Sequence, residues 1–135
     1  MDKHFGQRRE VELYMEHAHR MLVVAAHNLD NNFYASAVNR AYYAIFYAAN
    51  ATLTTKGITR SKHSGVISAF RLHFVKTGVF EVEYSRIYGR AMDDRHLSDY
   101  EIYETLTVEQ VRADLDGARR FVERVGTYLK REGWL

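Results

Sequence analysis

Arginine and histidine are the residues of this sequence whose types and spacing point most directly to chemistry. Arg95 and His96 stand ahead of Asp99 and Tyr100, and Arg90 precedes His96 with five residues between them. An arginine binds a phosphate through two parallel hydrogen bonds, and a histidine exchanges a proton near neutral pH. Together these two groups suffice, in principle, for cleavage of RNA without a metal, through attack of the ribose 2′-hydroxyl on the phosphate.

A second set of residues suited to an anion lies earlier in the chain. The net charge is only +2, but residues 31–80 contain no Asp or Glu and all of their charged side chains are basic. Such a segregated charge favours an anion or an acidic partner. The candidates for binding a nucleic acid or a nucleotide are Arg40, Tyr43, Lys56, Arg60, Lys62 and His63.

Apolar residues recur at helical spacing, and no strand-like alternation is sustained. We expect helices over about 11–29 and 33–56, a third that ends at Gly78, and a fourth that runs through Met92 into residues 93–96. A capping box at residues 107–110 opens the last helix, and residues 97–106 are expected to be irregular. The sequence therefore predicts an all-α fold, an antiparallel up-and-down helical bundle of four to five helices, as a single domain over residues 1–135.

Composition excludes several classes of site. The chain has no cysteine, so disulfides, thiolate zinc sites and iron–sulfur clusters are ruled out. Glu16 with His19 and Asp93 with His96 have the spacing of di-metal ligands, but the second and third predicted helices carry no carboxylate to complete such a site. We expect no metal and no cofactor. No phosphate-binding glycine loop or serine elbow is present either.

The amino-terminal residues lack the apolar core of a signal peptide, and no apolar run approaches the length of a membrane span. We therefore expect a cytoplasmic protein with no membrane partner.

Three stretches, in order along the chain, resemble the HEPN superfamily and in particular its small stand-alone prokaryotic members. Residues 36–46 (SAVNRAYYAIF) resemble the second-helix signature of the family, residues 62–67 (KHSGVI) the start of its third helix, and residues 95–100 (RHLSDY) its polar motif after the fourth helix. The resemblance implies an antiparallel helical bundle, commonly a homodimer. It also implies frequent pairing with a minimal nucleotidyltransferase in toxin–antitoxin modules, where many HEPN partners are metal-independent ribonucleases.

In the nuclease members of this superfamily, a histidine follows an arginine a few residues later. Tyr100 stands where the best-studied arrangement has that histidine, and Arg90 with His96 is the pair that meets the looser spacing. The first hypothesis is an RNA- or nucleotide-binding protein with metal-independent ribonuclease activity, the toxin-like partner of a nucleotidyltransferase. In it, Arg95 holds the phosphate, His96 transfers the proton, and Asp99 and Tyr100 orient them.

Two alternatives stay open. In the first, the role is structural: a network of Arg95, Asp99 and Tyr100 attaches the irregular connection to the bundle. In the second, the chain is a catalytically inactive helical interaction module, which docks an acidic partner protein through the basic residues 31–80.

Overall fold

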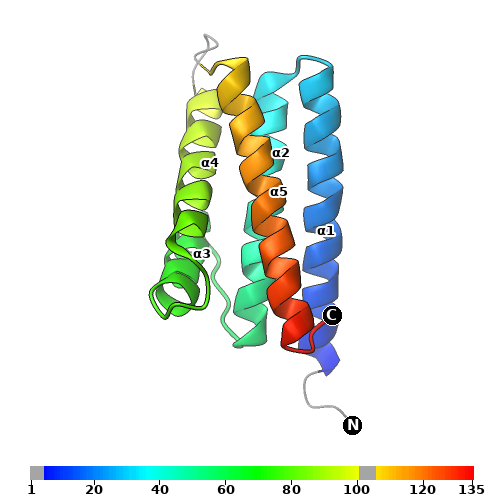
Figure 1. Cartoon of the computed structure of the whole chain (residues 1–135), viewed down its shortest axis with the longest axis vertical. Coiled ribbons are helices and arrows are strands. Elements are labelled where there is room, and N and C mark those ends of the chain that lie inside the picture. The colour runs from blue at the N-terminus through cyan, green and yellow to red at the C-terminus, as the bar shows by residue number, and fades with distance from the viewer. Residues whose placement is uncertain (1–4, 101–105) are drawn as a thin grey trace.

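The structure is a computed structural model that describes residues 5–100 and 106–135, without the side chain of Tyr100. Its helices are α1 (Phe5–Asp30), α2 (Tyr34–Thr55), α3 (His63–Phe70), α4 (Val82–Tyr100) and α5 (Val108–Arg131), with a π-helical segment η1 (Arg71–Val75) after α3. α1, α2, α4 and α5 run alternately up and down, and α3 lies across this bundle near the lower end of α4 (Figure 1). The predicted all-α helical bundle is confirmed.

Helices end where the sequence has residues that tolerate a left-handed backbone. Asn32 follows α1 with a φ of 64°, Gly57 follows α2 with a φ of 69°, and Gly78 follows η1 with a φ of 82°. Glycine adopts this conformation without steric cost, and asparagine adopts it more readily than most residues. The predicted capping box is confirmed, because the Thr107 side chain accepts a hydrogen bond from the Gln110 backbone and the Gln110 side chain accepts one from the Thr107 backbone.

The third helical stretch ends before Gly78 as expected, but it changes character on the way: α3 ends at Phe70 and the chain continues as η1, in which each turn takes up an additional residue. One expectation about the helices was wrong. Residues 97–100, expected to be irregular, form the last turn of α4 instead. This extra turn is supported by an ion pair between Arg95 and Asp99, one helical turn apart, with 3.3 Å between the charged atoms.

α2 is the central helix, in contact with α1, α3, α4 and α5. Its buried faces are rich in alanine, whose small side chain lets neighbouring helices approach closely. The buried alanines are Ala37, Ala41, Ala44, Ala48, Ala49 and Ala51. Helices cover most of the circumference of α2, and the side chains left half-buried on it include Tyr43 and Tyr47.

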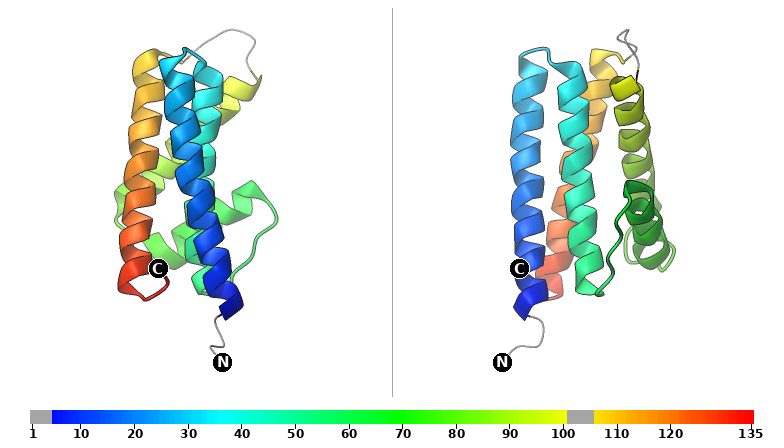
Figure 2. Two further views of the ribbon diagram at one scale, coloured as in Figure 1. Left: turned by 90° about the vertical axis from the view of Figure 1, so that its right-hand side faces the viewer. Right: turned by 180° about the vertical axis from the view of Figure 1, so that it is seen from behind.

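The connection from α2 to α3 positions the start of α3. Residues 56–62 turn back along α2, so that α3 begins partway up the bundle rather than at its lower end (Figure 2). The first residue of α3, His63, therefore lies against the middle of α2 and in reach of the last turns of α4.

Candidate functional site

The last turns of α4 hold Arg95 against α2. The Cζ atom of Arg95 lies 4.8 Å from the ring centroid of Tyr42 and 5.4 Å from that of Tyr43. Its Nε atom lies 3.3 Å from Oδ2 of Asp99 but makes no hydrogen bond among the described residues. The side chain keeps 19% of its surface exposed. Ring contacts and the ion pair therefore position the guanidinium without capturing all of its N–H groups.

His63 is the imidazole that packs beside this arginine. Its ring stacks on Phe46 with 4.4 Å between centroids, and its Nδ1 atom lies 2.7 Å from the Tyr42 hydroxyl and 3.5 Å from Nη1 of Arg95. Burial, and then the positive charges of Arg95 and His96, lower the pKa of His63. His63 is therefore neutral at neutral pH.

Arg95 decides where the proton of the neutral ring resides. The Tyr42 hydroxyl, which stays protonated because burial raises the pKa of Tyr42 to about 12, can either donate or accept a hydrogen bond. Arg95 can only donate, so Nδ1 of His63 is the acceptor and the proton lies on Nε2. We call Arg95, Asp99, His63, Tyr42 and Phe46 the Arg95 centre.

The structure brings together part of the set predicted from the sequence. Arg95, Asp99, His63 and Tyr43 meet at or beside the Arg95 centre. His96 has an exposed side chain, and its charge acts on His63. The side chain of Tyr100 lies outside the described residues.

Arg90 lies on a different face of α4 and does not join the Arg95 centre. Its Nε atom is 3.5 Å from Oδ1 of Asp114 on α5, whose carboxyl group is buried. Burial, and then the neighbouring carboxyl of Asp94, raise the pKa of Asp114, while Arg90 lowers it. Neither Asp114 oxygen has a hydrogen-bond partner among the described residues, and a proton shared between the carboxyl groups of Asp114 and Asp94 would satisfy one of them.

The remaining residues predicted to bind a nucleic acid or a nucleotide are exposed, and they are spread over a longer surface than the Arg95 centre. Arg40 lies on α2, while Arg60 and Lys62 lie in the connection that leads to His63. The Arg60 side chain packs against Gly65, where an added Cβ would come within 3.3 Å of it. Lys56 lies at the far end of α2, with its ammonium 5.4 Å from the Phe74 ring centroid, and so belongs to another part of the bundle.

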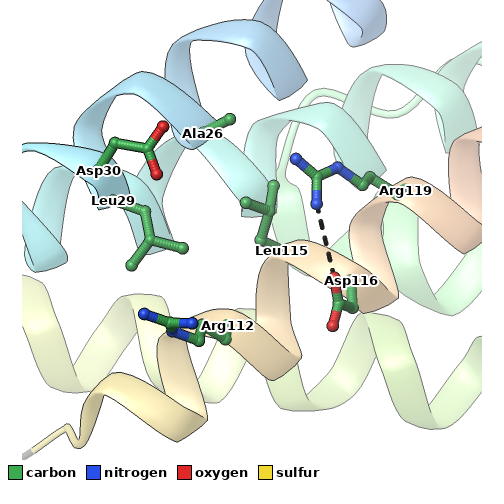
Figure 3. A pocket seen from close by; sticks show the side chains of 7 residues that line it. All are labelled: Ala26, Leu29, Asp30, Arg112, Leu115, Asp116 and Arg119. Atoms are coloured by element: carbon green, nitrogen blue, oxygen red, sulfur yellow. Dashed lines mark ion pairs between the residues drawn. The ribbon is translucent and has the colours of Figure 1, made fainter.

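A hollow elsewhere on the bundle lies between α1 and α5 (Figure 3). Arginine and aspartate side chains alternate around it, and Arg119 pairs with Asp116 at 3.5 Å. It contains none of the residues predicted from the sequence. Its lining is Ala26, Leu29, Asp30, Arg112, Leu115, Asp116 and Arg119.

Over residues 5–100 and 106–135, no three or more His, Cys, Asp or Glu side chains cluster in a way that could hold a metal ion. Within the same ranges, none of the helices combines the length and the apolar character needed to cross a membrane.

The described residues thus form an all-α bundle with an arginine–histidine centre between α2, α3 and α4. The model of the HEPN domain matches residues 11–130, and the chain belongs to the HEPN family. The resemblance carried by residues 36–46, 62–67 and 95–100 is thereby confirmed.

Several relatives match along most of their length. The "Putative toxin MJ0605" of Methanocaldococcus jannaschii is 38% identical over 91% of this chain and 91% of its own. A "UPF0332 protein" of Thermotoga maritima is 37% identical over 85% of this chain and 87% of its own. The "Putative toxin MJ0142" of Methanocaldococcus jannaschii is 33% identical over 90% of this chain and 83% of its own.

Sequence reasoning missed Tyr42 and Phe46 as members of the site, because both belong to the apolar face of α2. One signal pointed to Tyr42: a buried tyrosine hydroxyl needs a hydrogen-bond partner, and His63 supplies it. That partner could not be identified from spacing, since 21 positions separate the two residues.

Proposed function

We propose that the protein binds RNA at the Arg95 centre and cleaves it without a metal. The observation that carries this proposal is the Arg95 guanidinium, which is partly exposed, held over two tyrosine rings and adjacent to the neutral His63. A guanidinium fixed in this way is suited to the paired oxygens of a phosphate. Membership of the HEPN family and the names of two relatives as putative toxins support a toxin-like activity.

The proposed reaction is an internal transfer of the phosphoryl group. The ribose 2′-oxygen attacks phosphorus while the bond to the 5′-oxygen breaks, which gives a 2′,3′-cyclic phosphate and a 5′-hydroxyl end. Arg95 offsets the charge on the phosphate oxygens, and the Nε2 proton of His63 donates a further hydrogen bond to them. His96 accepts the proton of the 2′-hydroxyl, and the 5′-oxygen takes a proton from water.

The test is cleavage of single-stranded RNA in the presence of EDTA. We expect the wild-type protein to produce 2′,3′-cyclic phosphate ends and Arg95→Ala to lower the rate by about 100-fold or more, because it removes the phosphate-binding donor. Arg86→Ala, an exposed arginine of α4, is the matched control and keeps the wild-type rate. Arg90→Ala tests the pair of Arg90 and His96, which was selected from its spacing in the sequence alone.

Circular dichroism of each variant shows whether the helices are retained. Wild-type activity in a folded Arg95→Ala protein contradicts the role of Arg95. Failure of the wild-type protein to cleave RNA contradicts the reaction itself, while retained RNA binding would leave the binding site in place.

The partnership is part of the same proposal. We propose that the chain works as a homodimer with a nucleotidyltransferase-domain protein. Affinity capture from the native host tests the partner, and sedimentation tests the dimer. Recovery of unrelated proteins only, or a monomer at micromolar concentration, contradicts the respective statement.

A second candidate function has an observation of its own. Arg40, Lys56, Arg60 and Lys62 are all exposed, and residues 31–80 hold no acidic side chain that could neutralise them. An interaction module that docks an acidic protein would use these basic residues, with Lys56 lying apart from the others at the far end of α2. Capture of an acidic partner, together with no RNA cleavage and no mobility shift with single-stranded RNA, favours this second function.

A further inference from the structure

Aromatic rings continue from the Arg95 centre across α2 and onto α1. The Tyr43 ring, 5.4 Å from Cζ of Arg95, lies 6.0 Å from the Tyr47 ring. Tyr47 in turn lies 5.4 Å from the ring of His17 and 6.3 Å from that of Tyr14. We call Tyr43, Tyr47, Tyr14 and His17 the aromatic track. The track leads from Arg95 to Tyr43, then to Tyr47, and from there to both His17 and Tyr14, with similar distances between successive groups.

The rings of the aromatic track differ from the core rings in their exposure. Tyr42, Phe70 and Phe121 are fully buried. Tyr14, Tyr43 and Tyr47 are only half-buried, and His17 is exposed. A hollow of about 220 Å³ opens at the α1 end, lined by Glu10, Leu13, Tyr14 and His17. The track therefore presents ring surface to solvent over two neighbouring helices.

We propose that the aromatic track stacks successive bases of single-stranded RNA whose phosphate is held by Arg95. The inference rests on the proposed RNA binding and adds the form of RNA and the residues that hold its bases. Half-exposed aromatic rings stack on unpaired bases of any sequence, since every base has a π face. Steps of 5.4 to 6.3 Å exceed the repeat of about 3.4 Å of a stacked strand, so the track fits a strand whose bases are spread apart.

Charge favours RNA over a second copy of this chain as the occupant. α2 carries Arg40 one turn from Tyr43, and it has no acidic residue along its length. Two copies that met face to face through α2 would bring their two Arg40 side chains into one interface with no acidic residue of α2 to offset them, which opposes the contact. A polyanion instead gains from the same charges.

Glu10 sets the expected end of the track. It borders the hollow beside Tyr14, and burial, followed by the negative charge of Glu10, raises the pKa of Tyr14. A phosphate placed at this end would meet a carboxylate, so the bound strand is expected to end there. We therefore expect affinity to rise with oligonucleotide length up to about four nucleotides and then to level off, at the short end of known single-strand site sizes.

The experiment uses fluorescence anisotropy with 2′-O-methyl oligouridylates of increasing length, which the protein cannot cleave because the attacking hydroxyl is blocked. We expect Tyr47→Leu to weaken binding of a six-nucleotide strand about fivefold or more, and Tyr47→Phe to bind like the wild type because it keeps the ring. Tyr14→Leu provides a second loss of a ring, on a different helix. Tyr34→Leu, a tyrosine of α2 outside the track, is the matched control and leaves binding unchanged.

Each result supports or overturns the inference. Wild-type affinity in Tyr47→Leu and Tyr14→Leu overturns the aromatic track but leaves RNA binding at Arg95 in place. A wild-type protein that binds none of the strands overturns both the track and the proposed function. If sedimentation shows that Tyr47→Leu dissociates a dimer, the aromatic track is a contact between two copies of the chain, which also overturns the inference.

Discussion

His63 takes its properties from three side chains on other helices. The Arg95 guanidinium and the Tyr42 hydroxyl both lie within hydrogen-bond distance of its Nδ1 atom, and Phe46 stacks on its ring. A proton added at Nδ1 would face the Arg95 guanidinium at 3.5 Å and would be poorly solvated. The same contacts that hold the ring next to Arg95 therefore keep it neutral.

This arrangement predicts a pH dependence of stability. Folding lowers the pKa of His63 below its usual value of about 6.5, so the unfolded chain takes up a proton first as the pH falls. The stabilisation from His63 is complete above that value and is lost as the pH falls through the lowered pKa. Urea denaturation at pH 7.5 and pH 5 should show His63→Gln less stable than the wild type, with a smaller difference at pH 5.

His19→Gln, an exposed histidine of α1, is the matched control. A difference between wild type and His63→Gln that stays constant with pH contradicts the prediction.

α4 contacts neighbouring helices through two of its faces. Arg95 and Asp99 are one turn apart and face α2 and α3, while Arg90 and Asp94 are likewise one turn apart and lie beside Asp114 of α5. The same helix thus contributes to the Arg95 centre on one face and contacts the buried carboxyl group of Asp114 on another. Its length past residue 96 is what lets Asp99 reach Arg95.

The α4–α5 contact predicts a second pH dependence, of opposite sign. Folding raises the pKa of Asp114, so the folded chain holds a proton that the unfolded chain has released, and the stabilisation is lost as the pH rises through the raised pKa. Asp114→Asn cannot lose a proton, so its melting temperature should fall less than that of the wild type between pH 6 and pH 9. Asp116→Asn, an exposed carboxylate of the same helix, should behave like the wild type. Parallel curves for wild type and Asp114→Asn would count against the raised pKa.

At the scale of the whole molecule, an aromatic cluster joins three of the helices. Phe121 of α5 lies 5.1 Å from Phe70 of α3, and 6.1 Å and 5.7 Å from Tyr84 and Tyr88 of α4. Phe74 and Phe80 extend the same cluster toward the turn after η1. Loss of the Phe121 ring therefore weakens the packing of α5 against both α3 and α4.

We predict that Phe121→Ala lowers the free energy of unfolding by about 3–5 kcal/mol, since it removes a fully buried ring and leaves a cavity. Such a loss is a large share of the roughly 5–15 kcal/mol of an ordinary domain. Leu72→Ala, with 52% of the residue exposed, should change it by no more than about 0.5 kcal/mol. Urea denaturation measures both variants, and a loss below about 1 kcal/mol for Phe121→Ala contradicts the shared-cluster argument.

The sequence by itself determined the all-α class, the order of the helices and the family, because helical periodicity, turn residues and short motifs are local properties of the chain. It also pointed to Arg95, Asp99 and His63 as candidates. Only the tertiary structure decided that His63 packs against Arg95, that the Tyr42 hydroxyl lies within hydrogen-bond distance of His63, and that α4 extends through residue 100. These contacts join residues 21 and 32 positions apart, and they depend on where a loop returns along α2 and how helices cross, which local spacing does not encode.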